Sequence, residues 1–491
     1  MKRRVLKAAG WNLAEIGVKN GLALAFTIVL ARLLTPADFG LVAMLSMFVG
    51  IATTLAEGGL GAALIQTPKP SETDKSTLFW AQLGLALVLG AALAGLGPWL
   101  AAWFDQPVLT PLAIAYGVNL LIGAPASIQI SLFYKTLDVR AITLTSLIAQ
   151  VAGGAVGVGV ALRGAGPWAI VAQAIVASGV TTAMLWLQSS WRPRLTFSWN
   201  SLRQLGGFGA SSVGIGMLAE VESRIASLTI GHFAGPADAG QYQRAASFQL
   251  LLARLMSGVV TRVAFPAFSA VQHDRARLAN ALREAAFINF AATAAIMWCV
   301  ALVADPLVRL LFGAQWGPAA PVLQALCLAA GFYPVYAIFS KALRAVGQNW
   351  LVFAQHLVRA GGMCAVALAF GGYGFSTLAW AQAGFLILML PMGALAVARS
   401  IGYGVRGQIA DFAPIVVAGA LMWPAALAVD PLVDHLNILM RIIIVASLAM
   451  FVYLAAIGLW LRLIPPRAGR MAMETLSMVL RRGRHSGEQS S

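Results

Sequence analysis

A small set of charged and amide side chains lies inside segments of the chain that are otherwise apolar. A charge at membrane depth costs at least ~2.5 kcal/mol, so each such group should face protein, water or a ligand. The residues predicted to bind a substrate are Lys19, Asn20, Arg224, Arg244, Arg254, Arg262 and Arg359. The carboxylates predicted to act in ion coupling or charge pairing are Glu15, Glu57, Glu220 and Glu222.

Cations outnumber carboxylates in this set, and most of the cations are arginines. Arginine offers a planar fork of donors that matches the oxygens of a phosphate group. The residues concentrate in the first two apolar segments and in the seventh and eighth, which can line a shared central cavity. A water-filled cationic cavity would suit a phosphate or pyrophosphate group.

A second interpretation is that the charges neutralise one another inside the protein. Glu15 and Lys19 are four residues apart, as are Glu220 and Arg224, and side chains at this spacing meet on one helix face. Arg254 lies near the middle of its segment and could be tied to an acid on another helix. The acids considered for it are Glu57 and Glu222, whereas Arg244 and Arg262 could be interfacial.

Known catalytic and metal-binding patterns do not occur in the sequence. There is no Walker motif, nucleophile elbow, HExxH or Cys/His cluster. Cys299, Cys327 and Cys364 lie far apart in apolar runs, as packed hydrophobic residues do. We therefore expect neither enzymatic activity nor a cofactor or metal.

The composition is that of a membrane protein with many spans. Hydrophobic residues make up 59% of the chain and charged residues 11%, compared with roughly 25% charged in soluble domains. The net charge of +16 is better explained by cytoplasmic loops than by nucleic acid. A helix needs about 20 apolar residues to cross the hydrocarbon core of a membrane. On this criterion we predict an all-α integral membrane protein with about 14 transmembrane helices. Their approximate ranges are 11–33, 40–66, 78–104, 108–134, 141–162, 167–188, 205–232, 240–270, 284–304, 318–342, 350–370, 374–398, 411–429 and 437–463.

The basic residues predict the orientation. With a cytoplasmic N-terminus, about 24 of the 34 Lys and Arg residues fall on the inner side, and about four fall in the outer connections. The outer four are Arg32, Arg163, Arg309 and Arg441. This asymmetry runs the length of the chain and predicts that both termini are cytoplasmic.

The chain contains an internal duplication. Leu30–Gly40, LARLLTPADFG, is echoed by Ile230–Gly240, IGHFAGPADAG, and each copy predicts a tight turn between two helices. The lag of about 200 residues equals six spans, which predicts a parallel repeat. The predicted domains are an N-lobe at 1–190, a C-lobe at 191–400, two extra helices at 401–465 and a basic cytoplasmic tail at 466–491. An amphipathic stretch around 471–480 should lie on the anionic inner leaflet.

Three passages resemble a known family. Leu30–Gln66 resembles the amino-terminal signature of bacterial polysaccharide transporters, which belong to the multidrug/oligosaccharidyl-lipid/polysaccharide flippase superfamily. Glu222–Tyr242, ESRIASLTIGHFAGPADAGQY, and Asp305–Val322, DPLVRLLFGAQWGPAAPV, resemble two further passages of the family. Glu222 or Ser223 stands where an Asp is common, so no cation-binding role is assigned there.

The resemblance implies two six-helix lobes around a central cavity that work by alternating access. It also implies a flippase that moves polyprenyl-pyrophosphate-linked oligosaccharide from the cytoplasmic to the periplasmic leaflet of the bacterial inner membrane, for exopolysaccharide or lipopolysaccharide O-antigen synthesis. Membrane lipids, and polymerase and export machinery, are the implied partners. By the same resemblance, Lys19, Arg224 and Arg254 face the cavity, with Arg32 and Arg244 as weaker candidates.

Two other functions compete with this reading. A cation-coupled multidrug exporter of the same fold would need a compact acidic ion site and an aromatic cavity, and the excess of arginine opposes it. A membrane polysaccharide polymerase or ligase would need a sizeable outer loop with catalytic residues, whereas the predicted outer connections are short.

Overall fold

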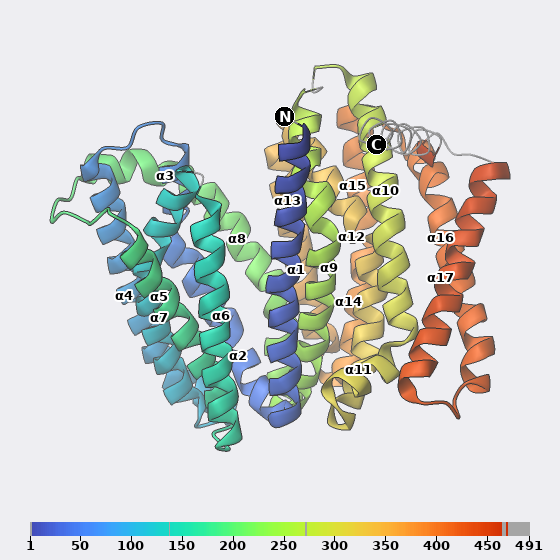
Figure 1. Ribbon diagram of the computed structural model, residues 1–491, viewed down its shortest axis with the longest axis horizontal. Helices are drawn as coiled ribbons and strands as arrows, with labels where there is room; N and C mark the ends of the chain where they lie inside the picture. Colours follow the sequence, from blue (N-terminus) through green and yellow to red (C-terminus); the bar gives the residue numbers. More distant parts are fainter. Residues whose placement is uncertain (1, 137, 271–272, 464–467, 470–491) are drawn as a thin grey trace. The chain divides into compact units, whose positions relative to one another are not determined.

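The computed structural model describes residues 2–136, 138–270, 273–463 and 468–469. Side chains are described at these positions except at 2–16, 62, 139, 206–212, 254, 256–267 and 269–270. Every regular element in this part of the chain is a helix (Figure 1). The helices form two compact units. Unit 1 comprises the chain up to Arg244 together with residues 363–378, and unit 2 comprises 245–362 and the chain from Ala379 onward.

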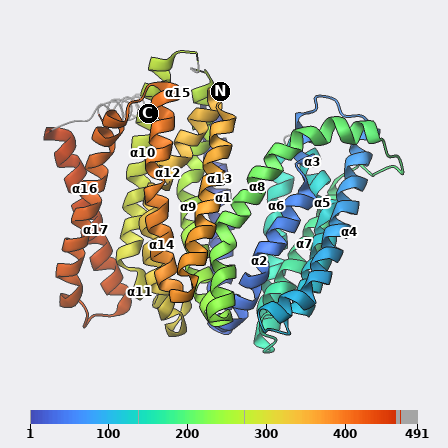
Figure 2. The same ribbon diagram turned by 180° about the vertical axis from the view of Figure 1, so that it is seen from behind.

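Unit 1 contains the first eight α-helices, the start of a ninth and a short η2 turn. Their bounds are α1 (Lys2–Leu33), α2 (Pro36–Glu57), α3 (Leu60–Gln66), α4 (Glu72–Trp103), α5 (Leu109–Lys135), α6 (Val139–Leu162), α7 (Trp168–Gln188), α8 (Trp199–Ala234), α9 (Pro236–Ala270) and η2 (Gly371–Tyr373). Helices α4 and α5 pack together, as do α6 and α7. Helix α8 packs against α2, α3 and α4 (Figure 2). Leu45, Leu100 and Leu112 lie in the core of this unit, fully buried.

Unit 2 contains the remainder of α9 and most of the later helices, except that residues 363–370 of α13 and 375–378 of α14 belong to unit 1. Their bounds are α10 (Arg275–Leu302), α11 (Ala304–Phe312), η1 (Ala314–Ala319), α12 (Ala320–Ala345), α13 (Asn349–Phe370), α14 (Phe375–Leu388), α15 (Leu390–Ile401), α16 (Val405–Val429), η3 (Asp430–Leu432) and α17 (Ile438–Leu463). Helix α10 packs against α12, α16 and α17, and its Leu282 and Phe290 anchor the core.

The all-helical prediction is confirmed, and each predicted span coincides with a helix or a pair of helices. Eleven segments of the described residues are long and apolar enough to cross a membrane, and the long helices α1, α8 and α9 match the other three predicted spans. The protein is therefore a multi-pass membrane protein. The boundary predicted at 190/191 between the lobes stays a prediction, and the predicted tail beyond 470 lies outside the described residues.

Two predicted spans differ from the structure because the chain breaks inside them. Helix α2 ends at Glu57, and Gly58 and Gly59 then adopt φ values of 55° and 63°, which favour glycine. The span predicted at 374–398 is divided at Met389 into α14 and α15. The connection after α10 is not a simple loop, because it folds into α11 and η1.

Both copies of the duplicated motif form the predicted turn between helices. Thr35 and Asp38 make a capping box, in which the Asp38 carboxylate accepts from the Thr35 backbone N–H at 2.9 Å. The second copy turns at Gly235, with φ of 86°, before Pro236 opens α9. The first turns of α2 and α9 touch reciprocally in unit 1. A Cβ atom on Gly40 would overlap the Pro236 carbonyl, and one on Gly240 would overlap the Pro36 carbonyl.

Candidate functional site

Three of the predicted residues, on α1 and α2, are at least partly exposed in the structure. Lys19 is exposed and Asn20 is half-buried on α1, and Glu57 is exposed as the last residue of α2. Lys19 makes no ion pair among the side chains that are described. The Glu15 side chain lies outside the described residues, so the predicted Glu15–Lys19 pair stays a prediction.

The predicted pair on α8 is confirmed. The Arg224 Nε group donates to the Glu220 carboxylate one helical turn before it. The two side chains keep 32% and 26% of their exposure, respectively. Gly50 of α2 leaves the space for this pair, because a Cβ atom there would run into the Glu220 carboxylate and lie 3.1 Å from Arg224 Nε. The pair therefore sits in the α2–α8 contact with one side open.

The predicted cations Arg244 and Arg359 lie in a different environment. Both are buried, at 6% and 7% exposure. In unit 1 the Arg244 guanidinium lies 3.9 Å from the centroid of the Phe39 ring, and in unit 2 Arg359 lies 4.2 Å from that of Tyr336. A guanidinium over an aromatic face is stabilised by the ring quadrupole. Glu222 is half-buried on α8, and the side chains of Arg254 and Arg262 lie outside the described residues.

The sequence reasoning missed a buried ion pair in unit 2. The Arg283 Nε atom of α10 lies 3.7 Å from the Asp411 carboxylate of α16. The Tyr403 hydroxyl donates to the same carboxylate at 2.7 Å, and the Ala468 backbone N–H donates to it at 3.2 Å. Burial raises the pKa of the Tyr403 phenol above its usual range, and the hydrogen bond to Asp411 raises it further. Asp411 stands directly before a long apolar run, and this position could have indicated that its carboxylate is buried and needs a partner.

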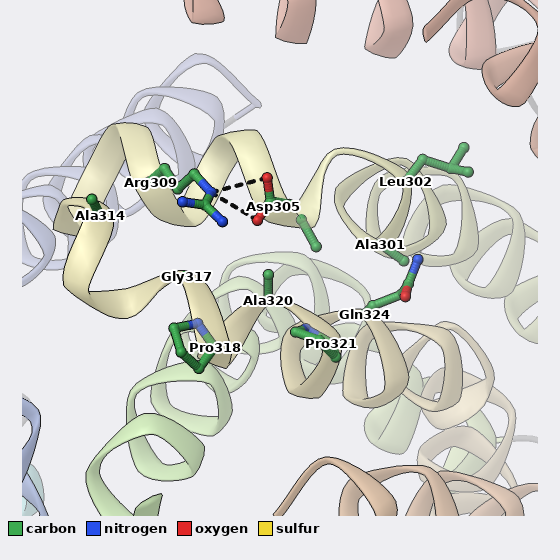
Figure 3. A pocket seen from close by; sticks show the side chains of 11 residues that line it. Ala301, Leu302, Asp305, Arg309, Ala314, Gly317, Pro318, Ala320, Pro321 and Gln324 are labelled. Carbon is green, nitrogen blue, oxygen red and sulfur yellow. Dashed lines mark hydrogen bonds and ion pairs between the residues drawn. The ribbon is translucent and has the colours of Figure 1, made fainter. Parts of the chain in front are cut away.

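It also missed a cavity in unit 2. A cavity of about 560 Å³ lies between α10, α11, η1 and the start of α12 (Figure 3). Its polar lining comes from Asp305 and Arg309 of α11 and Gln324 of α12. Arg309 Nε donates to both Asp305 oxygens, at 2.9 and 3.1 Å. Most of the lining residues belong to the passage 305–322, which resembles a family passage and could have indicated the cavity.

The described side chains include no cluster of three or more His, Cys, Asp or Glu residues that could hold a metal ion. The polar groups of the described sites offer hydrogen bonding and charge pairing. The half-exposed Arg224 can exchange its carboxylate partner for another anion, whereas the Asp411 pair is enclosed by protein.

Curated relatives include proteins of succinoglycan and lipopolysaccharide biosynthesis. The chain is 29% identical over 359 residues to the succinoglycan biosynthesis transport protein ExoT of Rhizobium meliloti (strain 1021), covering 73% of this chain and 72% of that protein. It is 26% identical to the lipopolysaccharide biosynthesis protein WzxC of Escherichia coli (strain K12), covering 67% of each chain.

Solved structures support the fold. The lipid II flippase MurJ, in an inward closed conformation, superimposes with a TM-score of 0.75 at 16% identity and covers 91% of this chain and 98% of its own. An inward-facing multidrug resistance MATE transporter gives 0.63 at 17% identity, covering 78% of this chain and 94% of its own. These structures confirm the predicted fold. Because a family model described as polysaccharide biosynthesis protein matches residues 29–321, more than half of the sequence, the chain belongs to that family.

Proposed function

We propose that the protein is a flippase that moves polyprenyl-pyrophosphate-linked oligosaccharide from the cytoplasmic to the periplasmic leaflet by alternating access. The observation that carries the proposal is the half-exposed Arg224 in a membrane-length helix. Its setting is a chain that is 29% identical to a succinoglycan transport protein. The product would serve exopolysaccharide or lipopolysaccharide synthesis, as the names of the relatives suggest.

Arg224 supplies the headgroup contact in this proposal. Its Nε group is engaged by Glu220, and its two terminal amino groups carry further N–H donors. A pyrophosphate offers oxygens that match this fork better than a single carboxylate does. Lys19, exposed on α1, adds a point charge, and Asn20 adds an amide.

The remaining predicted residues divide by burial. Arg244 and Arg359 each lie over an aromatic ring, and we propose that these contacts stabilise the units in which they lie. Arg254 and Arg262 stay proposed substrate contacts, and Glu15, Glu57 and Glu222 stay proposed partners for these cations or for a coupling ion. The proposed location is the bacterial inner membrane with both termini cytoplasmic, and polymerase and export machinery are the proposed partners.

The test is transport in proteoliposomes that contain the lipid-linked oligosaccharide of the host. Movement is measured as the fraction of sugar that a membrane-impermeant glycosidase or lectin can reach. We expect Arg224→Ala to slow transport at least about tenfold, which corresponds to about 1.4 kcal/mol. Arg224→Lys should recover part of the rate, because it keeps the charge and loses the fork. Arg163→Ala is the matched control, since Arg163 is an exposed cation of an outer connection.

Wild-type protein that leaves the sugar inaccessible would contradict the proposal. The same vesicles loaded with a cationic dye test the rival drug exporter. Dye efflux without sugar movement would favour that rival over the flippase.

A further inference from the structure

The passage 305–322 forms α11, η1 and the start of α12 in unit 2, and we call it the platform. Phe312 and Trp316 are buried, and the Phe312 ring packs edge-on against Phe248 at 5.7 Å between centroids. Gly313 joins α11 to η1 with φ of 104°, a conformation that other residues rarely adopt. The two buried aromatic residues anchor the passage in the core of the unit.

Small residues line much of the cavity, which lies partly within this passage. Alanine, glycine and proline form most of the wall, and Figure 3 shows Gly317 and Pro318 beneath Arg309. A Cβ atom on Gly317 would lie 3.0 Å from the terminal Nη2 atom of Arg309 and 3.1 Å from Cζ. Gly317 therefore gives the guanidinium the room it occupies. The volume of about 560 Å³ lies within the usual range of ligand pockets, about 300–1,000 Å³.

The polar groups of the cavity keep unused hydrogen-bonding capacity. Asp305 engages Arg309 only through Nε, which leaves the terminal amino groups as donors. The Gln324 amide has no hydrogen-bond partner among the described residues, and it offers a donor and an acceptor. The Asp305 oxygens have lone pairs left for further donors. Donors and acceptors thus lie together within one small space (Figure 3).

The charges around the cavity disfavour an anionic ligand. Asp305 neutralises Arg309, and Arg441 nearby is held by Asp430 at 2.7 Å and by Asp434. Arg441 also lies within range of the Asp305 charge. Because carboxylates balance or outnumber these arginines, a neutral ligand fits better than a phosphate. Hydroxyl groups, which both donate and accept, match such a lining.

We propose that this cavity is a saccharide subsite that holds a sugar unit of the transported oligosaccharide on the periplasmic side. The proposal rests on the proposed function for the identity of the ligand and on the charge asymmetry for the side of the membrane. Asp305 and Gln324 would accept from sugar hydroxyls, and the terminal amino groups of Arg309 would donate to them. The proline and alanine walls would cover the apolar face of the ring.

The test measures binding of the free sugar to the full-length protein in lipid nanodiscs. The probe is the water-soluble oligosaccharide released by mild acid from the polyprenyl-linked precursor of the host, followed by saturation-transfer NMR. Ala314→Trp fills the cavity from an exposed lining position and should weaken binding at least about tenfold. Gln315→Trp is the matched control, because Gln315 is the exposed neighbour outside the lining. Gln324→Ala should weaken binding several-fold without adding bulk.

The outcomes separate this proposal from the proposed function. Absence of oligosaccharide binding, or equal binding by the wild type, Ala314→Trp and Gln324→Ala, overturns the subsite. If the wild type still moves the lipid-linked sugar in proteoliposomes, the flippase proposal survives that result. Binding that Ala314→Trp abolishes and Gln315→Trp retains supports the subsite. Equal loss in both tryptophan variants, with Gln324→Ala unchanged, overturns it.

Discussion

Two carboxylate–guanidinium pairs in the molecule differ in their access to solvent. The Arg224–Glu220 pair of unit 1 keeps about a third and a quarter of its side-chain exposure, at 32% and 26%. The Arg283–Asp411 pair of unit 2 keeps 15% and 4%, and Tyr403 and the Ala468 N–H complete the shell of its carboxylate. A half-exposed pair can exchange partners with an incoming anion, whereas an enclosed pair has no such route. The difference supports the proposal that the first pair contacts the substrate, and it makes the second pair a buried structural contact.

The largest expected effect comes from breaking the enclosed pair. Asp411→Asn leaves the Arg283 guanidinium buried without its counter-charge, and we expect a loss of about 3 kcal/mol in the free energy of unfolding. The measurement is the thermal unfolding temperature of the purified protein in detergent. Asp434→Asn is the matched control, because Asp434 pairs with Arg441 at the surface with 66% exposure and should change stability by less than about 1 kcal/mol. Equal shifts in the two variants would remove the distinction between enclosed and open pairs.

An intermediate effect is expected from Glu220→Gln in the open pair. Removing the carboxylate charge frees the Arg224 guanidinium for a phosphate, so the KM for the lipid-linked substrate should fall about two- to tenfold. The unfolding temperature should change little, since a half-exposed pair contributes about 0–1 kcal/mol. The kinetic measurement is the initial transport rate as a function of substrate density in proteoliposomes. Asp105→Asn, at an exposed carboxylate, is the control, and an unchanged or increased KM in Glu220→Gln would argue against exchange at Arg224.

The smallest stability effect is expected at a pair that is more exposed than either of these two. Arg309 and Asp305 keep 47% and 54% of their exposure, so Arg309→Ala should alter the free energy of unfolding by no more than about 0.5 kcal/mol. The same variant should lose oligosaccharide binding, because it removes the donors of the cavity. Chemical or thermal unfolding in parallel with the NMR experiment measures both. A large loss of stability would mean that Arg309 supports the platform and does not serve the ligand.

Local interactions could be predicted from the sequence. The spacing of Glu220 and Arg224 fixed their meeting on one helix face, and the turns at Pro36 and Pro236 followed from the inability of proline to continue a helix. The apolar runs predicted the helices, although Gly58 and Gly59 ended α2 early. These features depend on residues within one or two turns of each other.

Long-range contacts could not be predicted in the same way. Arg283 of α10 pairs with Asp411 of α16, a helix that is distant in sequence. Arg309 was placed in an outer loop, yet it lines a cavity that α10, η1 and α12 complete. Arg244 and Arg359 were predicted to contact substrate because a charge at membrane depth is costly. In the structure, their guanidinium groups lie over the rings of Phe39 and Tyr336, respectively.

By itself, the sequence determined that this is a duplicated helical membrane protein rich in arginine, because hydropathy, helical period and turn chemistry are local properties. Only the tertiary structure decided which cations are open and which are enclosed. That distinction depends on which helices pack around each side chain, as Gly50 and α2 do at Glu220 and as α10 and α16 do at Asp411. Residue spacing along the chain does not predict those neighbours, since they come from segments distant in sequence.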